Sequence, residues 1–247
     1  GMYEYRFKVR QNGTYWYHSH TMLQEQQGVY GAIVIHPKAG SKSAEREYAV
    51  VLSDWTDENP HEVLRTLKRG SHYYAQQKGA LPSWLGALRH GGLGTMLKNE
   101  WDRMAPMDIS DVAYDAFLAN GKKDLQLDAN PGERVRLRLI NAGAATYFYV
   151  EAAGQALEIE AADGLTVTPV SVQRLLIAIA ETYDVIIKVP AEGSIEIRAT
   201  AQDGSGKTSI LLGRGSPLTA SDVPKPDPYS AHAHHGSAHN SADHAQM

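Results

Sequence analysis

The sequence contains no cysteine among its 247 residues, which excludes disulfides, thiolate zinc sites and cysteine nucleophiles within this chain. Long hydrophobic runs are also missing: residues 175–180 (LLIAIA) are strand-length and far too short to span a bilayer. Positive charge is not in excess, since 24 Lys and Arg stand against 28 Asp and Glu. The net charge of −4 therefore argues against a nucleic-acid binder with a basic surface.

The composition that remains is that of a globular protein, with 43% hydrophobic and 21% charged residues. The first strands come early. Residues 3–10 (YEYRFKVR) alternate apolar and charged side chains, which predicts a half-buried strand and not a secretory signal. Residues 14–20 and 28–36 predict two more strands. Three strands over about 36 residues are too few to fold alone, so residues 1–37 are interpreted as the last strands of an incomplete first domain.

Residues 44–215 are interpreted as a second, complete domain. A strand at 48–52 leads to a helix that Asn59 caps, with Pro60 at its first position. The irregular stretch at about 59–106 predicts a partly helical insertion. From residue 112 onward short strands and turns alternate; in ERVRLRLI, Val135, Leu137 and Leu139 share one face and three arginines the other. This pattern predicts an all-β, antiparallel Greek-key sandwich or barrel. Acidic residues at strand ends are interpreted as turn and cap residues: Asp54, Asp57, Asp163, Glu181 and Asp184.

Residues 216–247 form a proline- and histidine-rich segment with almost no large apolar side chains, which predicts a flexible tail. Its five histidines would bind copper or nickel weakly, and whether that binding serves a physiological role stays open. They are His232, His234, His235, His239 and His244.

The motif with the clearest chemistry is His18-Ser19-His20, which lies in the predicted strand at 14–20. Residues two apart on a strand face the same way, so both imidazoles should project from one face. Neutral imidazole suits copper, zinc, iron or nickel. The pair could serve one metal ion or two neighbouring ions, and the alternative is two polar residues on a solvent-facing strand. Other histidines (His36, His61, His72, His90) and the methionines Met96, Met104 and Met107 are interpreted as surface or packing residues.

Residues 13–37 (GTYWYHSHTMLQEQQGVYGAIVIHP) resemble the end of the first cupredoxin domain of multicopper oxidases. The resemblance continues in order through VVLSDWTDENP, MDISDVAYDAFLANGK, PGERVRLRLIN, EAADG and AETYDV, and is strongest to the copper-resistance (CopA-type) members. It implies a cupredoxin-like fold and copper as the cofactor. It also implies that His18 and His20 each bind a different copper of the type 3 pair. The family's trinuclear cluster uses eight histidines from four H-x-H motifs, and this sequence contains one of those four. The family's type 1 copper needs a cysteine, which this chain lacks.

The resemblance further implies part of an oxidase that couples oxidation of Cu(I), phenols or similar reductants to reduction of O2 to water. The chain alone is expected to be inactive and to depend on the missing cupredoxin domains. It would be periplasmic or secreted. A homo-oligomer through residues 1–36 is a further expected assembly, with no nucleic-acid partner and no membrane span. The alternative function is a non-enzymatic module that binds or sequesters copper.

Overall fold

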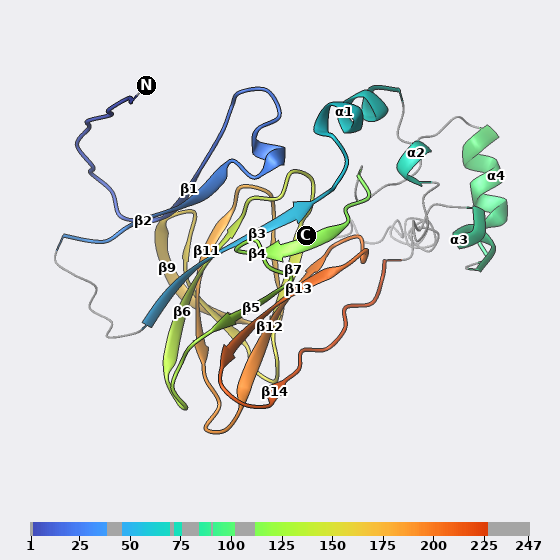
Figure 1. Cartoon of the computed structure of the whole chain (residues 1–247). Coiled ribbons are helices and arrows are strands. Elements are labelled where there is room, and N and C mark those ends of the chain that lie inside the picture. The colour runs from blue at the N-terminus through green and yellow to red at the C-terminus, as the bar shows by residue number, and fades with distance from the viewer. Residues whose placement is uncertain are drawn as a thin grey trace, which may run out of the picture.

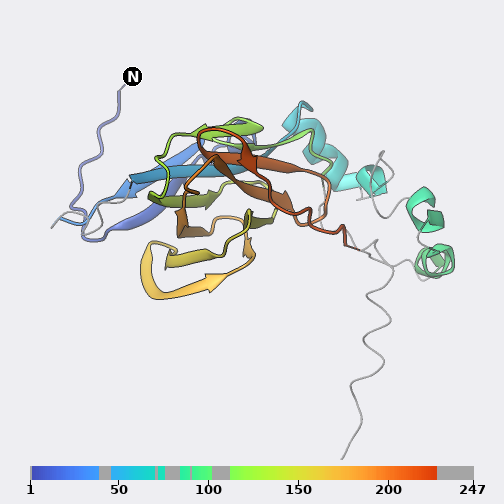
Figure 2. The same ribbon diagram turned by 90° about the horizontal axis from the view of Figure 1, so that it is seen from below.

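The computed structural model describes residues 2–38, 46–69, 72–75, 84–89, 91–101 and 112–226. Two six-stranded sheets pack face to face, a two-stranded hairpin lies outside one of them, and a group of helices extends from one end (Figures 1 and 2). The predicted all-β sandwich is thereby confirmed, as an open sandwich and not a closed barrel.

The first sheet lies under the hairpin, and its strands follow a mixed order. In spatial order they are β4 (Ala116–Ala119), β3 (Arg46–Trp55), β6 (Arg134–Asn141), β11 (Thr182–Lys188), β8 (Leu157–Ala162) and β9 (Leu165–Val172). The second sheet has the order β10 (Leu175–Ile177), β7 (Phe148–Ala152), β12 (Ser194–Ala201), β13 (Lys207–Gly213) and β5 (Asp124–Leu127), and β14 (Pro217–Leu218) pairs with β12. Three pairs are parallel (β3 with β6, β5 with β13, β12 with β14), where the sequence predicted antiparallel pairing throughout.

The core between the sheets comes from the alternation predicted for β6. Val135, Leu137 and Leu139 are fully buried, because they point at the facing sheet, while the arginines between them lie on the opposite face. Phe148 of β7 is also fully buried and packs edge-on against Phe117, with ring centroids 5.8 Å apart. Burial of such apolar area supplies the main stabilisation of the sandwich.

Strands β4, β5 and β9 were not predicted from the sequence. Strands β4 and β5 have only four residues each, too few to show a period, and flank the turn at Asn120-Gly121. Strand β9 contains Pro169 and is mostly exposed. It lies at the edge of its sheet, where a proline is tolerated because one side of the strand has no partner.

The helices lie in the predicted insertion: α1 (Pro60–Arg69), α2 (His72–Ala75), α3 (Trp84–Arg89) and α4 (Leu93–Trp101). The predicted cap is confirmed, since Asn59 Oδ1 accepts a hydrogen bond from the His61 amide at 2.9 Å. None of the helices in the described part of the chain is long and apolar enough to cross a membrane.

The hairpin consists of β1 (Gly13–His18) and β2 (Tyr30–Ile35), with a short 3₁₀ helix (Glu25–Gln27) in the connecting loop. One face of it packs on the outside of the first sheet. Trp16, Tyr30 and Ala32 contact a small cluster made of Val51, Ile140 and Ala142. The hairpin is therefore attached to the sandwich of its own chain.

The predicted strand at residues 3–10 is wrong. Residues 2–12 have no regular secondary structure, and Tyr3, Tyr5 and Phe7 are 81–86% exposed. A strand needs a neighbour to receive its backbone hydrogen bonds, and no strand of the described residues pairs with this segment. The five tail histidines, His90, Met104 and Met107 lie outside the described residues, as does most of the predicted linker at 39–47.

Candidate metal centre

The hairpin brings His18 and His20 together at the end of β1. Strand β1 ends at His18, so His20 lies just beyond it, and the prediction that both histidines belong to the strand is wrong for His20. The two rings nevertheless lie side by side, with centroids 4.6 Å apart and planes tilted by 38°. Trp16 stacks on His18 with centroids 4.3 Å apart and planes 12° from parallel. Trp16 thus stacks on His18, and His20 lies tilted against the same ring.

A carboxylate lies beside the His18 ring. Nδ1 of His18 is 3.0 Å from Oε2 of Glu25, and both side chains are largely buried, with 29% and 21% of their surfaces exposed. The same Nδ1 is shielded from solvent and makes no well-aligned hydrogen bond within the described residues. The contact is therefore at hydrogen-bond distance, but its angle is poor.

The two imidazoles suit copper as part of its ligand set. Imidazole nitrogens are ligands that copper accepts, and the structure brings two imidazoles into contact. The shielded Nδ1 without an aligned partner belongs to His18. Within the described residues, however, no group of three or more His, Cys, Asp or Glu side chains could hold a metal ion by itself. The pair can therefore supply part of a coordination sphere but not all of it.

The other predicted surface residues stay apart from this pair. His36 is exposed at the end of β2, where its Nδ1 lies 3.9 Å from Oε2 of Glu47, with 61% of the side chain exposed. His61 is exposed in the first turn of α1. Met96 is half-buried in α4.

A buried polar network anchors β1 four residues before His18. Thr14 is 1% exposed; its hydroxyl donates to Asp184 Oδ1 at 2.6 Å and accepts from Arg138 Nη1 at 2.8 Å. Arg138 Nη1 also contacts Asp184 Oδ2 at 2.5 Å, and Thr182 Oγ1 donates to the Thr14 carbonyl at 3.0 Å. Asp184 lies within β11, so its interpretation as a turn residue is wrong: it is the anion that fixes the hairpin on the sheet.

Three of the other acidic residues do hold loops, as predicted. Glu181 Oε2 accepts a hydrogen bond from the Ala178 amide at 2.8 Å. The Asp54 carboxylate accepts hydrogen bonds from the backbone amides of Ala144, Ala145 and Thr146 at 2.9–3.0 Å. Asp163 Oδ1 accepts from the Thr182 amide at 3.0 Å. These contacts satisfy backbone donors that the loops would otherwise bury without partners.

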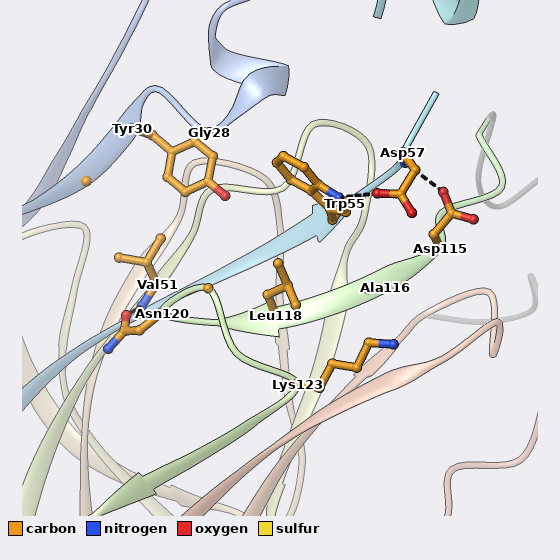
Figure 3. A pocket seen from close by; sticks show the side chains of 12 residues that line it. Gly28, Tyr30, Val51, Trp55, Asp57, Asp115, Ala116, Leu118, Asn120 and Lys123 are labelled. Atoms are coloured by element: carbon orange, nitrogen blue, oxygen red, sulfur yellow. Dashed lines mark hydrogen bonds between the residues drawn. The ribbon is translucent and has the colours of Figure 1, made fainter. Parts of the chain in front are cut away.

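A cavity of about 740 Å³ opens between β2 and the β3–β4 pair (Figure 3). Tyr30 and Trp55 form its aromatic wall; Trp55 Nε1 donates to Asp57 Oδ1 at 3.0 Å, and the Asp57 amide donates to Asp115 Oδ2 at 2.8 Å. Burial raises the pKa of the Tyr30 hydroxyl. His18 and His20 do not line this cavity, although Tyr30 is the residue paired with His18 across the hairpin.

Comparison with known proteins identifies the class. The multicopper oxidase family profile matches residues 46–211, and a second multicopper oxidase profile matches residues 1–40. The chain therefore belongs to the multicopper oxidase family, whose cofactor is copper. The second profile covers the hairpin with His18 and His20, and the first covers the sandwich.

Among individual proteins, the chain is similar to copper resistance protein A of Escherichia coli, with 44% identity over 92% of this chain and 39% of that protein. It is 32% identical to multicopper oxidase MmcO of Mycobacterium tuberculosis, over 88% of this chain and 42% of that protein. The chain thus spans about two fifths of the length of these curated relatives.

Solved structures share the fold. Fet3p, a multicopper oxidase that functions in iron import, matches with a TM-score of 0.63 and 16% identity, over 88% of this chain and 37% of that one. A laccase from Botrytis aclada matches with a TM-score of 0.60 and 22% identity, over 90% of this chain and 38% of that one. At such identities the likeness is one of fold alone.

Glu25 is the neighbour of the histidine pair that sequence reasoning missed. It lies seven residues after His18, in a stretch with no strand or helix period, and only the path of the loop returns it to the ring. The available signal was a carboxylate in a short loop that directly follows an H-x-H motif.

Proposed function

We propose that His18 and His20 are copper ligands and that this chain is part of a copper-dependent oxidase. The observation that carries the proposal is the contact of the two imidazoles at the end of β1, in a chain of the multicopper oxidase family. The alternative is that His18 and His20 are two polar side chains on a solvent-facing strand, which need not contact each other.

Copper supplies one-electron transfer, so that four electrons from Cu(I), phenols or similar reductants convert O2 and four protons to two water molecules. This chain's own residues bind and orient. His18 and His20 offer ring nitrogens, and Trp16 covers one face of the His18 ring. The remaining ligands come from outside the described residues, because copper in such clusters needs more than two nitrogen donors.

The partner surface is the side of the hairpin that faces away from the sandwich. Tyr17 and Ile33 are 54% and 39% exposed there, and the preceding residues 2–12 carry exposed apolar side chains at alternate positions. Such a surface suits additional β-strands. We assign residues 1–37 to an incomplete first cupredoxin domain. The strands that complete it come from further cupredoxin domains or, as the alternative, from a second copy of the chain. We assign residues 44–215 to the second domain and residues 216–247 to the tail, whose first strand, β14, pairs with β12 of the second domain. We also infer that the protein is periplasmic or secreted.

Copper titration of the whole chain tests the proposal. All five tail histidines are first replaced by alanine, so that they do not compete. We expect the resulting chain to bind Cu(I) in competition with a chromophoric chelator, and His18→Ala or His20→Ala to abolish that binding. His36→Ala is the matched control, since His36 lies in the same hairpin region but is exposed and apart from the pair. Copper binding that survives both substitutions, or that depends equally on His36, would refute the assignment.

A further inference from the structure

The loop between β1 and β2 is held in a defined path. Ser19 Oγ donates to Gln24 Oε1 at 2.7 Å, and the Ser19 amide donates to the Val29 carbonyl at 3.1 Å. The Val29 amide in turn donates to the Gln24 carbonyl at 3.0 Å. Gly28 closes the 3₁₀ turn with φ of 90° and donates its amide to the Glu25 carbonyl at 2.9 Å. A residue with a side chain is strained at that φ, so glycine suits the turn. These bonds place Glu25 beside β1.

The Glu25 carboxylate reaches one particular atom of the histidine pair. Its Oε2 lies 3.0 Å from His18 Nδ1, which is shielded from solvent and has no aligned hydrogen-bond partner in the described part of the chain. Trp16 stacks on the face of the ring and His20 lies tilted beside it, whereas Nδ1 is an atom of the ring edge, where Glu25 lies. Glu25 is thus the acceptor that can satisfy this nitrogen.

Tautomer chemistry gives the contact a consequence. A neutral imidazole carries one N–H and one lone pair, and only the nitrogen with the lone pair can bind a metal. A carboxylate beside Nδ1 favours the tautomer with the proton on Nδ1, because a carboxylate can only accept. Nε2 then keeps the lone pair and points away from the carboxylate.

We propose that Glu25 is a positioning residue for His18: it holds the Nδ1 proton and thereby makes Nε2 the copper-binding nitrogen. The copper part of this statement rests on the proposed function, whereas the tautomer is a property of the metal-free chain. Carboxylates behind metal-binding histidines orient the ring and raise its basicity, and their removal costs about 10–100-fold in metal affinity. His20 has no such carboxylate contact among the described residues, so the effect should be specific to His18.

Nitrogen NMR of the metal-free chain tests the tautomer directly. The ¹⁵N-labelled chain is measured at about pH 8, where an ordinary histidine is neutral, and the His18→Ala variant assigns the His18 ring signals. We expect the Nδ1–H tautomer in the native chain and a shift toward the Nε2–H form in Glu25→Ala. Glu25→Gln should retain the Nδ1–H form, because the amide oxygen can accept the same proton. Gln26→Ala, which changes the neighbouring exposed residue of the same turn, should leave the tautomer unchanged.

Copper titration of the same variants completes the test, in the background without tail histidines. Glu25→Ala should raise the dissociation constant for copper about 10–100-fold, Glu25→Gln should raise it less, and Gln26→Ala should leave it unchanged. Retained dispersion of the amide spectrum shows that each variant is folded. A native Nε2–H tautomer, or a tautomer that Glu25→Ala leaves unchanged, would overturn the positioning role. If neither the native chain nor any variant binds copper, while Glu25→Ala still shifts the His18 tautomer, the proposed function is refuted and the positioning role of Glu25 stands.

Discussion

The ion pairs of Arg138 should contribute more to the free energy of unfolding than any other ion pair on the outer face of the first sheet. Arg138 is 8% exposed, and its guanidinium contacts Asp184, Thr14 and, at 2.9 Å, Oε2 of Glu47. The substitution Arg138→Met keeps most of the aliphatic volume but leaves two shielded carboxylates without their main cation. Removing one partner of a buried pair typically costs about 3–5 kcal/mol.

The cost should lie near the lower end of that range. Arg136 lies 3.9 Å from Oδ2 of Asp184 and 3.5 Å from Oε1 of Glu47, so it compensates part of the lost charge. We therefore expect Arg138→Met to lower the free energy of unfolding by about 3 kcal/mol. Thr14→Val removes one donor and one acceptor from the same network and should cost about 1–3 kcal/mol.

Urea unfolding followed by circular dichroism measures these costs. Arg134→Met is the matched control: it lies on the same strand and face, but its ion pair with Glu158 is exposed and should contribute less than about 1 kcal/mol. The double variant Arg138→Met/Asp184→Asn should be less destabilised than the sum of the two single variants, because it removes both charges. Equal costs for Arg138→Met and Arg134→Met would refute this account of the network.

Four further predictions concern the core, the hairpin contact, pH and oxidase activity. Phe148→Ala should lower the free energy of unfolding by about 3–5 kcal/mol in the same urea assay, because the ring is fully buried. Gly164→Ala should loosen β1, seen as faster amide hydrogen exchange, because φ is 78° and a Cβ would lie within 2.4 Å of the Tyr15 ring. Burial opposes ionisation of Glu196, but hydrogen bonds from Arg198, Ser209 and the Ala220 amide outweigh it and lower its pKa below 4.5. Its contribution to stability is therefore complete above that pH and lost as pH falls further, so Glu196→Gln should flatten the acid limb of stability against pH. The copper-loaded chain alone should not sustain O2 consumption with a phenol or Cu(I) in an oxygen electrode; sustained turnover would contradict the proposed need for further ligands.

Much of the fold could be predicted from local patterns, because each pattern reports which side chains share a face. Alternation in β6 identified Val135, Leu137 and Leu139 as core residues, and Asn59 with Pro60 identified the start of α1. The H-x-H spacing likewise identified the two imidazoles that the structure brings together. These features depend on residues within a few positions of one another, which is the range over which strand and helix geometry acts.

Tertiary structure alone decided whether a pattern found a partner. Residues 3–10 alternate as well as β6 does, yet they form no strand, since no strand among the described residues lies beside them. Asp184 reads as a turn residue in sequence, but β11 places it beneath Thr14, 170 positions away. Glu25 reaches His18 only because the loop between β1 and β2 turns back on itself. Periodicity specifies the direction of a side chain, whereas its neighbour depends on contacts between segments far apart in the chain, and local sequence does not encode those contacts.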